Sequence, residues 1–183
     1  MSDVSSLSTS TYSENEYLYV ANEGSGGGGG ETIVQIDASE SWESGIDGAT
    51  AFAETVGTGF NGPSGLAEVV VSGQPTETKL FISDDYGNVY SQSEADDFEV
   101  VIGGLSNPNA LSYSDSDDKL YIADAGNNQI IRTDPTDATP VQELVSSGLT
   151  GPQSVVVNSN ATELYNTDFS SQVYGTSLTT TTW

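Results

Sequence analysis

The sequence predicts an all-β fold built from four units of one repeating pattern. Three observations favour this class. The apolar runs are short, and turns rich in Gly, Asn, Asp and Pro separate them. No segment keeps the helical period of 3.6 residues over about ten residues. One pattern recurs along the chain at a nearly constant spacing, which is typical of repeat architectures.

The recurring pattern begins at a proline. Pro63, Pro108 and Pro152 are 45 and 44 residues apart, and each precedes an apolar run and then a strand of the Leu-Tyr-Ile-Ala-Asp type. A further unit at 17–22, without the proline, opens the chain. Units of about 40–45 residues have the size of one four-stranded propeller blade. The sequence therefore predicts a small β-propeller of four four-stranded blades.

Each unit is expected to hold four short antiparallel strands within a single domain. The strands expected from the apolar runs are 80–83, 89–91, 98–102, 110–113, 120–123, 129–132, 141–145, 155–157 and 176–183. The blades then span approximately 4–60, 61–105, 106–149 and 150–183.

Two stretches carry a family resemblance. The stretch 107–134 resembles an NHL repeat, through its proline turn and the run Leu-Tyr-Ile-Ala-Asp-Ala-Gly-Asn-Asn-Gln-Ile-Ile at 120–131. The first unit, with Leu-Tyr-Val-Ala-Asn-Glu at 18–23, is similar to the YVTN type of propeller repeat. Propellers of these families usually have six or seven blades. With four, the resemblance implies either a propeller that closes alone or half of a larger one that a second chain completes.

The charge restricts the partners. The 183 residues include 27 Asp and Glu but only 3 Lys and Arg, which gives a net charge of −24. Nucleic acids and anionic membrane surfaces are poor partners, because both require clustered cations. The acidic residues are dispersed rather than gathered in a tail. Such a surface suits molar salt, where the Debye length falls to about 3 Å and repulsion is screened. We therefore expect an extreme halophile or its virus.

The composition also restricts the chemistry and the location. The chain has no His and no Cys, which excludes His-based triads, thiol nucleophiles and the usual zinc sites. No stretch approaches the roughly 20 apolar residues of a membrane span, so no membrane insertion is expected. The N-terminus lacks the basic and apolar regions of a secretory signal. These observations favour a virion or the cytoplasm of an extreme halophile as the location.

A short polar residue ends the second strand of every unit: Asn22, Asp84, Asp124 and Asp168. The favoured interpretation is a structural turn cap, because such side chains accept hydrogen bonds from the backbone N–H groups of a following turn. The alternative is a set of oxygen ligands for Ca²⁺ or Mg²⁺. Repetition favours the cap, since a fold needs it in every blade and a catalytic site only once.

Asn109 is the candidate for an enzymatic alternative. The propeller likeness extends to metal-dependent lactonases of the gluconolactonase type, which place Glu and Asn ligands in a central channel. Asn109 follows a proline turn where a first strand would enter that channel, but Ser64 and Gln153 occupy the equivalent places. Metal candidates are therefore Asp84, Asn109, Asp124 and Asp168, and no cofactor is expected beyond such a cation.

The resulting functional expectation is a non-enzymatic structural or interaction module. Propellers of these families mostly supply binding and scaffold surfaces, so protein partners and a homo-oligomer or larger assembly are expected. A virion surface or spike component of a haloarchaeal virus would fit this description. The alternatives are an intracellular scaffold propeller and a metal-dependent, lactonase-like hydrolase.

Overall fold

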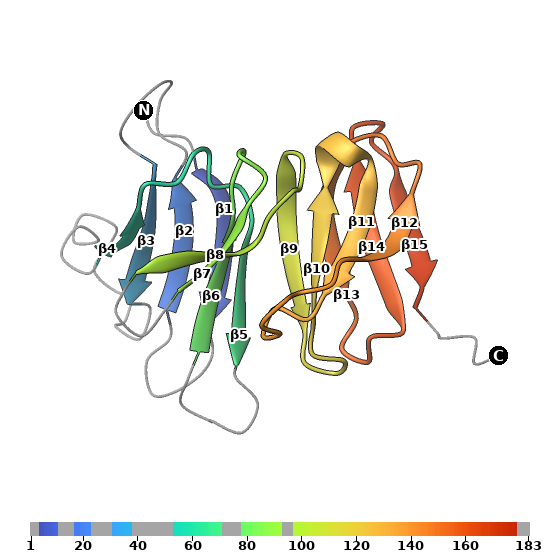
Figure 1. The fold of residues 1–183 in the computed structure, drawn as a ribbon. Coiled ribbons are helices and arrows are strands. Elements are labelled where there is room, and N and C mark those ends of the chain that lie inside the picture. Colours follow the sequence, from blue (N-terminus) through green and yellow to red (C-terminus); the bar gives the residue numbers. More distant parts are fainter. Residues whose placement is uncertain are drawn as a thin grey trace, which may run out of the picture.

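The computed structural model describes residues 4–10, 17–22, 31–37, 53–70, 78–92 and 97–178. Their regular secondary structure is almost entirely β-strand (Figure 1). The one helical segment among them is a 3-10 turn, Ala125–Asn127. The predicted all-β class is therefore confirmed. No helix in this part of the chain has the length and apolar character needed to cross a bilayer.

The strands form four antiparallel sheets, each built from consecutive strands. The first sheet contains β1 (Val4–Ser10), β2 (Tyr17–Asn22), β3 (Thr32–Asp37) and β4 (Ala53–Thr58). The second contains β5 (Leu66–Val70), β6 (Thr78–Ser83), β7 (Val89–Gln92) and β8 (Phe98–Ile102). The third contains β9 (Pro108–Ser114), β10 (Lys119–Asp124), β11 (Gln129–Thr133) and β12 (Glu143–Ser147). The fourth contains β13 (Pro152–Val157), β14 (Glu163–Asp168) and β15 (Val173–Ser177).

Most expected strands lie where the apolar runs placed them, with shifts at strand ends. Pro108 and Pro152 begin β9 and β13 instead of preceding them, which is permitted because the first residue of a strand need not donate a ladder hydrogen bond. The strand expected at 141–145 lies at Glu143–Ser147, because β11 pairs Arg132 with Glu143 and leaves Val141 beyond the ladder.

The last unit also differs from the expected four-stranded blade. Its described part contains three strands, and β15 begins at Val173, three residues before the range expected for the final strand. The remainder of that range, from 179 to 183, lies outside the described residues.

The four sheets pack one after another. Their first strands are neighbours in the order β1, β5, β9 and β13, and Figure 1 shows the first and fourth sheets at opposite ends of the molecule. Three apolar clusters fill the three junctions, represented by Tyr19 with Leu80, Phe81 with Leu120, and Tyr121 with Leu164. Among the described residues no such cluster joins the fourth sheet to the first. The arrangement is compatible with propeller-like blades.

The second strand of each inner sheet contributes to two junctions, because successive side chains of a strand point to opposite faces of the sheet. In β10, Leu120 and Ile122 belong to the cluster shared with the second sheet, whereas Tyr121 and Ala123 belong to the cluster shared with the fourth. Each inner sheet thus has one face for the sheet before it and another for the sheet after it.

Candidate functional site

The position that recurs in all four sheets is the end of the second strand, where three of the four residues are buried aspartates. Asp84 directly follows β6, while Asp124 and Asp168 are the last residues of β10 and β14. Asn22 is the last residue of β2 and is half-buried. The carboxylates therefore need hydrogen-bond donors, because a buried charge without partners is costly.

Asp124 is surrounded by donors from its own turn and from the loop that enters β9. Its Oδ1 accepts from the Ser106 backbone N–H at 2.7 Å. Its Oδ2 accepts from Asn127 Nδ2 and Gln129 Nε2, both at 2.8 Å. One carboxylate thus ties the strand end, the following turn and the loop into the first strand.

Asp168 repeats this arrangement in the fourth sheet. Its Oδ2 accepts from the Thr150 N–H at 3.2 Å, and its Oδ1 accepts from the Ser170 N–H at 2.9 Å and from the Ser170 hydroxyl. The Ser170 hydroxyl is the main cause that lowers the pKa of Asp168, and the backbone donors add to the effect. The carboxylate is therefore held in its ionised form.

Asp84 uses different donors at the same position. It accepts from the Asn88 N–H at 3.2 Å and from the Tyr90 hydroxyl at 3.0 Å. Burial, followed by this hydrogen bond to Asp84, raises the pKa of Tyr90. The loop to β5 is fixed instead through the backbone, where the Asp85 N–H donates to the Asn61 carbonyl at 2.8 Å.

The donors around these aspartates are the type of partners that a turn cap needs. Each aspartate lies in a different sheet, and within the described ranges no group of three or more Asp or Glu side chains is arranged to hold a metal ion.

Asn109 also makes a contact between sheets. Its Nδ2 donates to the Pro152 carbonyl at 3.4 Å. Ser64, at the equivalent place one sheet earlier, donates through its hydroxyl to the Pro108 carbonyl at 2.5 Å. In the second and third units, the residue after the proline thus contacts the proline of the next sheet. The sequence obscured this shared role, because the two residues differ in type.

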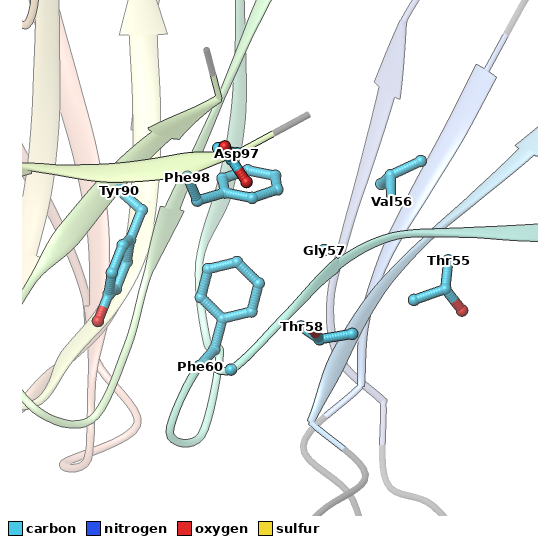
Figure 2. A pocket seen from close by; sticks show the side chains of 9 residues that line it. Thr55, Val56, Gly57, Thr58, Phe60, Tyr90, Asp97 and Phe98 are labelled. Atoms are coloured by element: carbon cyan, nitrogen blue, oxygen red, sulfur yellow. The ribbon is translucent and has the colours of Figure 1, made fainter. Parts of the chain in front are cut away.

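A pocket of about 480 Å³ opens between β4 and β8 (Figure 2). Its aromatic wall consists of Phe60 with Tyr90 and Phe98, whose rings both lie edge-on to Phe60 at a centroid distance of 5.2 Å. Figure 2 shows Asp97 beside Phe98 at one side of the opening. The sequence pattern does not predict that these residues meet, because Phe60 lies in a loop and Phe98 lies in the second sheet.

Comparisons with known proteins bear on the fold. No family model and no curated protein matches the chain. Among solved structures 147 chains match. One belongs to the crystal structure of a nidogen/laminin complex, with a TM-score of 0.66 and 16% sequence identity over 88% of this chain and 55% of that chain. The chain therefore spans about half the length of that solved chain, and the likeness concerns the fold alone.

Proposed function

We propose that this chain is a non-catalytic protein-interaction module of the NHL or YVTN propeller type that works in molar salt. The observation that carries this proposal is the exposed apolar surface of the fourth sheet. Val156, Tyr165 and Val173 are exposed on one face of its three strands. Apolar side chains gathered on one sheet mark a surface that a partner covers. The nidogen/laminin complex, as a protein–protein assembly of similar fold, is compatible with this function.

The setting we propose is an extreme halophile, with a virion surface or spike of a haloarchaeal virus as one place for such a module. The support is the net charge of −24 and the arrangement of the cations. Arg132 pairs with Glu143 at 2.9 Å and with Asp117 at 3.8 Å, and Lys119 pairs with Asp134 at 3.5 Å. These pairs lie around the third sheet, so most of the acidic surface depends on salt for screening.

Melting at two salt concentrations tests the halophilic part of the proposal. Repulsion among the carboxylates is unscreened at low ionic strength, so the melting temperature should be lower at about 0.1 M KCl than in molar KCl. A melting temperature that is equal or higher at about 0.1 M KCl would overturn this part of the proposal.

The non-catalytic part is tested against the lactonase alternative. Lactone hydrolysis should be undetectable in molar KCl with Ca²⁺, Mg²⁺ or Mn²⁺. Asn109→Ala is the informative variant and Gln153→Ala the matched control, because both residues follow a first-strand proline. Metal-dependent hydrolysis that Asn109→Ala abolishes and Gln153→Ala preserves would replace the interaction module with an enzyme.

A further inference from the structure

One position of the second strand distinguishes the last sheet from the others. Tyr19, Phe81 and Tyr121 occupy this position in the first three sheets and are 9%, 1% and 0% exposed. Each packs in the cluster that joins its sheet to the next one. Tyr165 occupies the position in β14 and is 45% exposed. Its exposure marks the place where a following sheet would lie.

The face around Tyr165 is an unpartnered junction surface. Directly opposite residues of antiparallel strands share a face, and Tyr165 lies opposite Val156 on one side and Gly175 on the other. Thr167, on the same face, lies opposite Val173. Val156 and Val173 are exposed, like Tyr165.

Among the described residues, a backbone hydrogen-bond acceptor is also left unused at this end. The carbonyls of Gly87 and Asn128 accept hydrogen bonds from the N–H groups of Leu105 and Leu149, in the loops that enter the next sheets. Ser171 is the counterpart in the fourth sheet, and no described residue donates to its carbonyl.

Gln153 completes the pattern. Its counterparts Ser64 and Asn109 donate to the proline of the next sheet, whereas Gln153 donates to the Gly151 carbonyl of its own loop at 3.1 Å. Both kinds of contact that join one sheet to the next inside the chain therefore stop at the fourth sheet.

The opposite end of the molecule carries the matching face. In the first sheet, Leu18 lies opposite Ile36 and Val20 lies opposite Val34. These four aliphatic side chains are partly buried and point away from the face that holds Tyr19 and Ile33 against the second sheet. Leu18 and Val20 occupy the β2 positions that Leu80 and Ile82 occupy in β6.

We propose that the Tyr165 face of the fourth sheet binds the Leu18–Val20 face of the first sheet in a second copy of this chain. Two reciprocal contacts of this kind would close a dimer of eight sheets. This inference rests on the proposed interaction module. A second copy is the occupant because the same strand positions already pack together within the chain. Between the first two sheets, Tyr19, the counterpart of Tyr165, packs with Leu80 and Ile82, the counterparts of Leu18 and Val20.

The charge sets the conditions of the contact. Two chains of net charge −24 repel one another, so association requires screening at molar salt. The two faces themselves are mostly uncharged, and the exposed Glu163 on β14 accepts a hydrogen bond from the Tyr165 hydroxyl at 2.8 Å. Dimers should therefore form in molar KCl and dissociate at about 0.1 M KCl.

Sedimentation velocity in molar KCl tests the contact with three variants. Tyr165→Glu and Leu18→Glu should each weaken association by about tenfold or more, because each introduces a charge into one apolar face. Tyr86→Glu is the matched control: Tyr86 is an exposed tyrosine in the turn after β6 and lies on neither face. It should remain dimeric.

Mixing the two disruptive variants tests the head-to-tail geometry. Tyr165→Glu keeps an intact first-sheet face and Leu18→Glu keeps an intact fourth-sheet face, so the mixture should associate through one contact although neither variant does so alone. A Leu18→Glu protein that still forms dimers would overturn the proposal in favour of contact between two fourth-sheet faces. Thermal melting checks that each variant folds, and Val34→Glu replaces Leu18→Glu if the latter does not.

The remaining outcomes separate this inference from the proposed function. A folded, inactive wild-type chain that stays monomeric at all concentrations in molar KCl would overturn the dimer and leave the interaction module standing, with another protein as occupant. Metal-dependent hydrolysis by a dimer would overturn the module and leave the contact between copies standing.

Discussion

The third and fourth sheets contain nearly the same second strand in different surroundings. Tyr121 in β10 is fully buried, whereas Tyr165 in β14 is 45% exposed. One residue further along, Ile122 of the third sheet is replaced by Asn166 in the fourth. The difference shows that the repeated pattern specifies a strand, while the neighbouring sheet decides how much stability each side chain contributes.

The pKa values of the two tyrosines are both raised, but by different main causes. Burial is the main cause that raises the pKa of Tyr121 to about 12, and its hydroxyl donates to Asp117 Oδ2 at 2.7 Å. The pKa of Tyr165 is raised mainly by the hydrogen bond that its hydroxyl donates to Glu163. The pKa of a tyrosine at this position is therefore set mainly by desolvation between the third and fourth sheets, and mainly by a surface hydrogen bond on the exposed face of the fourth.

Truncation of the two tyrosines should give the largest difference in stability between the third and fourth sheets. Tyr121→Ala should lower the free energy of unfolding by about 3–5 kcal/mol, because it leaves a cavity between the third and fourth sheets. Tyr165→Ala should cost less than about 1 kcal/mol in a dilute monomer, because its ring is already half in solvent. Denaturant unfolding in molar KCl measures both values, and equal losses would contradict the assigned difference in burial.

The left-handed turn residue offers a second matched pair. Gly87 has φ of +83°, and a Cβ there would clash with the Leu105 carbonyl oxygen. Gly87→Ala should cost about 3 kcal/mol. Ser171 adopts φ of +60° at the same place in the fourth sheet, so Ser171→Gly should instead raise stability by about 0.5–1 kcal/mol. A loss of stability in Ser171→Gly would contradict the backbone assignment.

Asn166 is the weak point of the third junction. It is buried, and neither its Nδ2 nor its Oδ1 has a hydrogen-bond partner, whereas its counterparts Ile82 and Ile122 are buried and apolar. Asn166→Val should raise the free energy of unfolding by about 1–3 kcal/mol, because it removes an unsatisfied polar group. Thermal melting checks this. Asn166→Asp is the control and should destabilise the protein, since it buries an unpaired charge.

The sequence predicted the elements that local patterns determine. The second strands and their terminal aspartates could be placed because alternation and turn residues act over a few positions. The start of β12 could not, since the pairing of Arg132 with Glu143 fixes it across the sheet. Proline likewise misled the prediction at Pro108 and Pro152, because its lack of an N–H suits a strand start as well as a turn.

Contacts between sheets were harder to predict. The amide of Asn109 donates to the carbonyl of Pro152, 43 residues away, and its role as a metal ligand stays a prediction. The aromatic pocket joins Phe60 from a loop with Phe98 from a neighbouring sheet. Such contacts depend on how the units stack, and a pattern within one unit carries no information on that.

Asp168 should make the stability of the fourth sheet depend on pH. Its pKa is lowered in the folded protein, chiefly by the Ser170 hydroxyl, so the folded state binds its proton less readily than the unfolded state does. The resulting stabilisation is fully present above the unfolded carboxyl pKa of about 4 and is lost as the pH falls through the lowered value. Asp168→Asn should therefore melt at a lower temperature than wild type at neutral pH, and the gap should close on acidification.

Ser170→Ala sharpens this test, because it removes one donor and leaves the carboxylate in place. At neutral pH, Ser170→Ala should lower the melting temperature less than Asp168→Asn does, since the backbone N–H groups of Thr150 and Ser170 still donate to Asp168. The decrease should follow the same pH dependence. Melting curves of the three proteins in molar KCl across the acidic range measure the effect. A gap between wild type and Asp168→Asn that stays constant with pH would show that the carboxylate charge does not stabilise this turn.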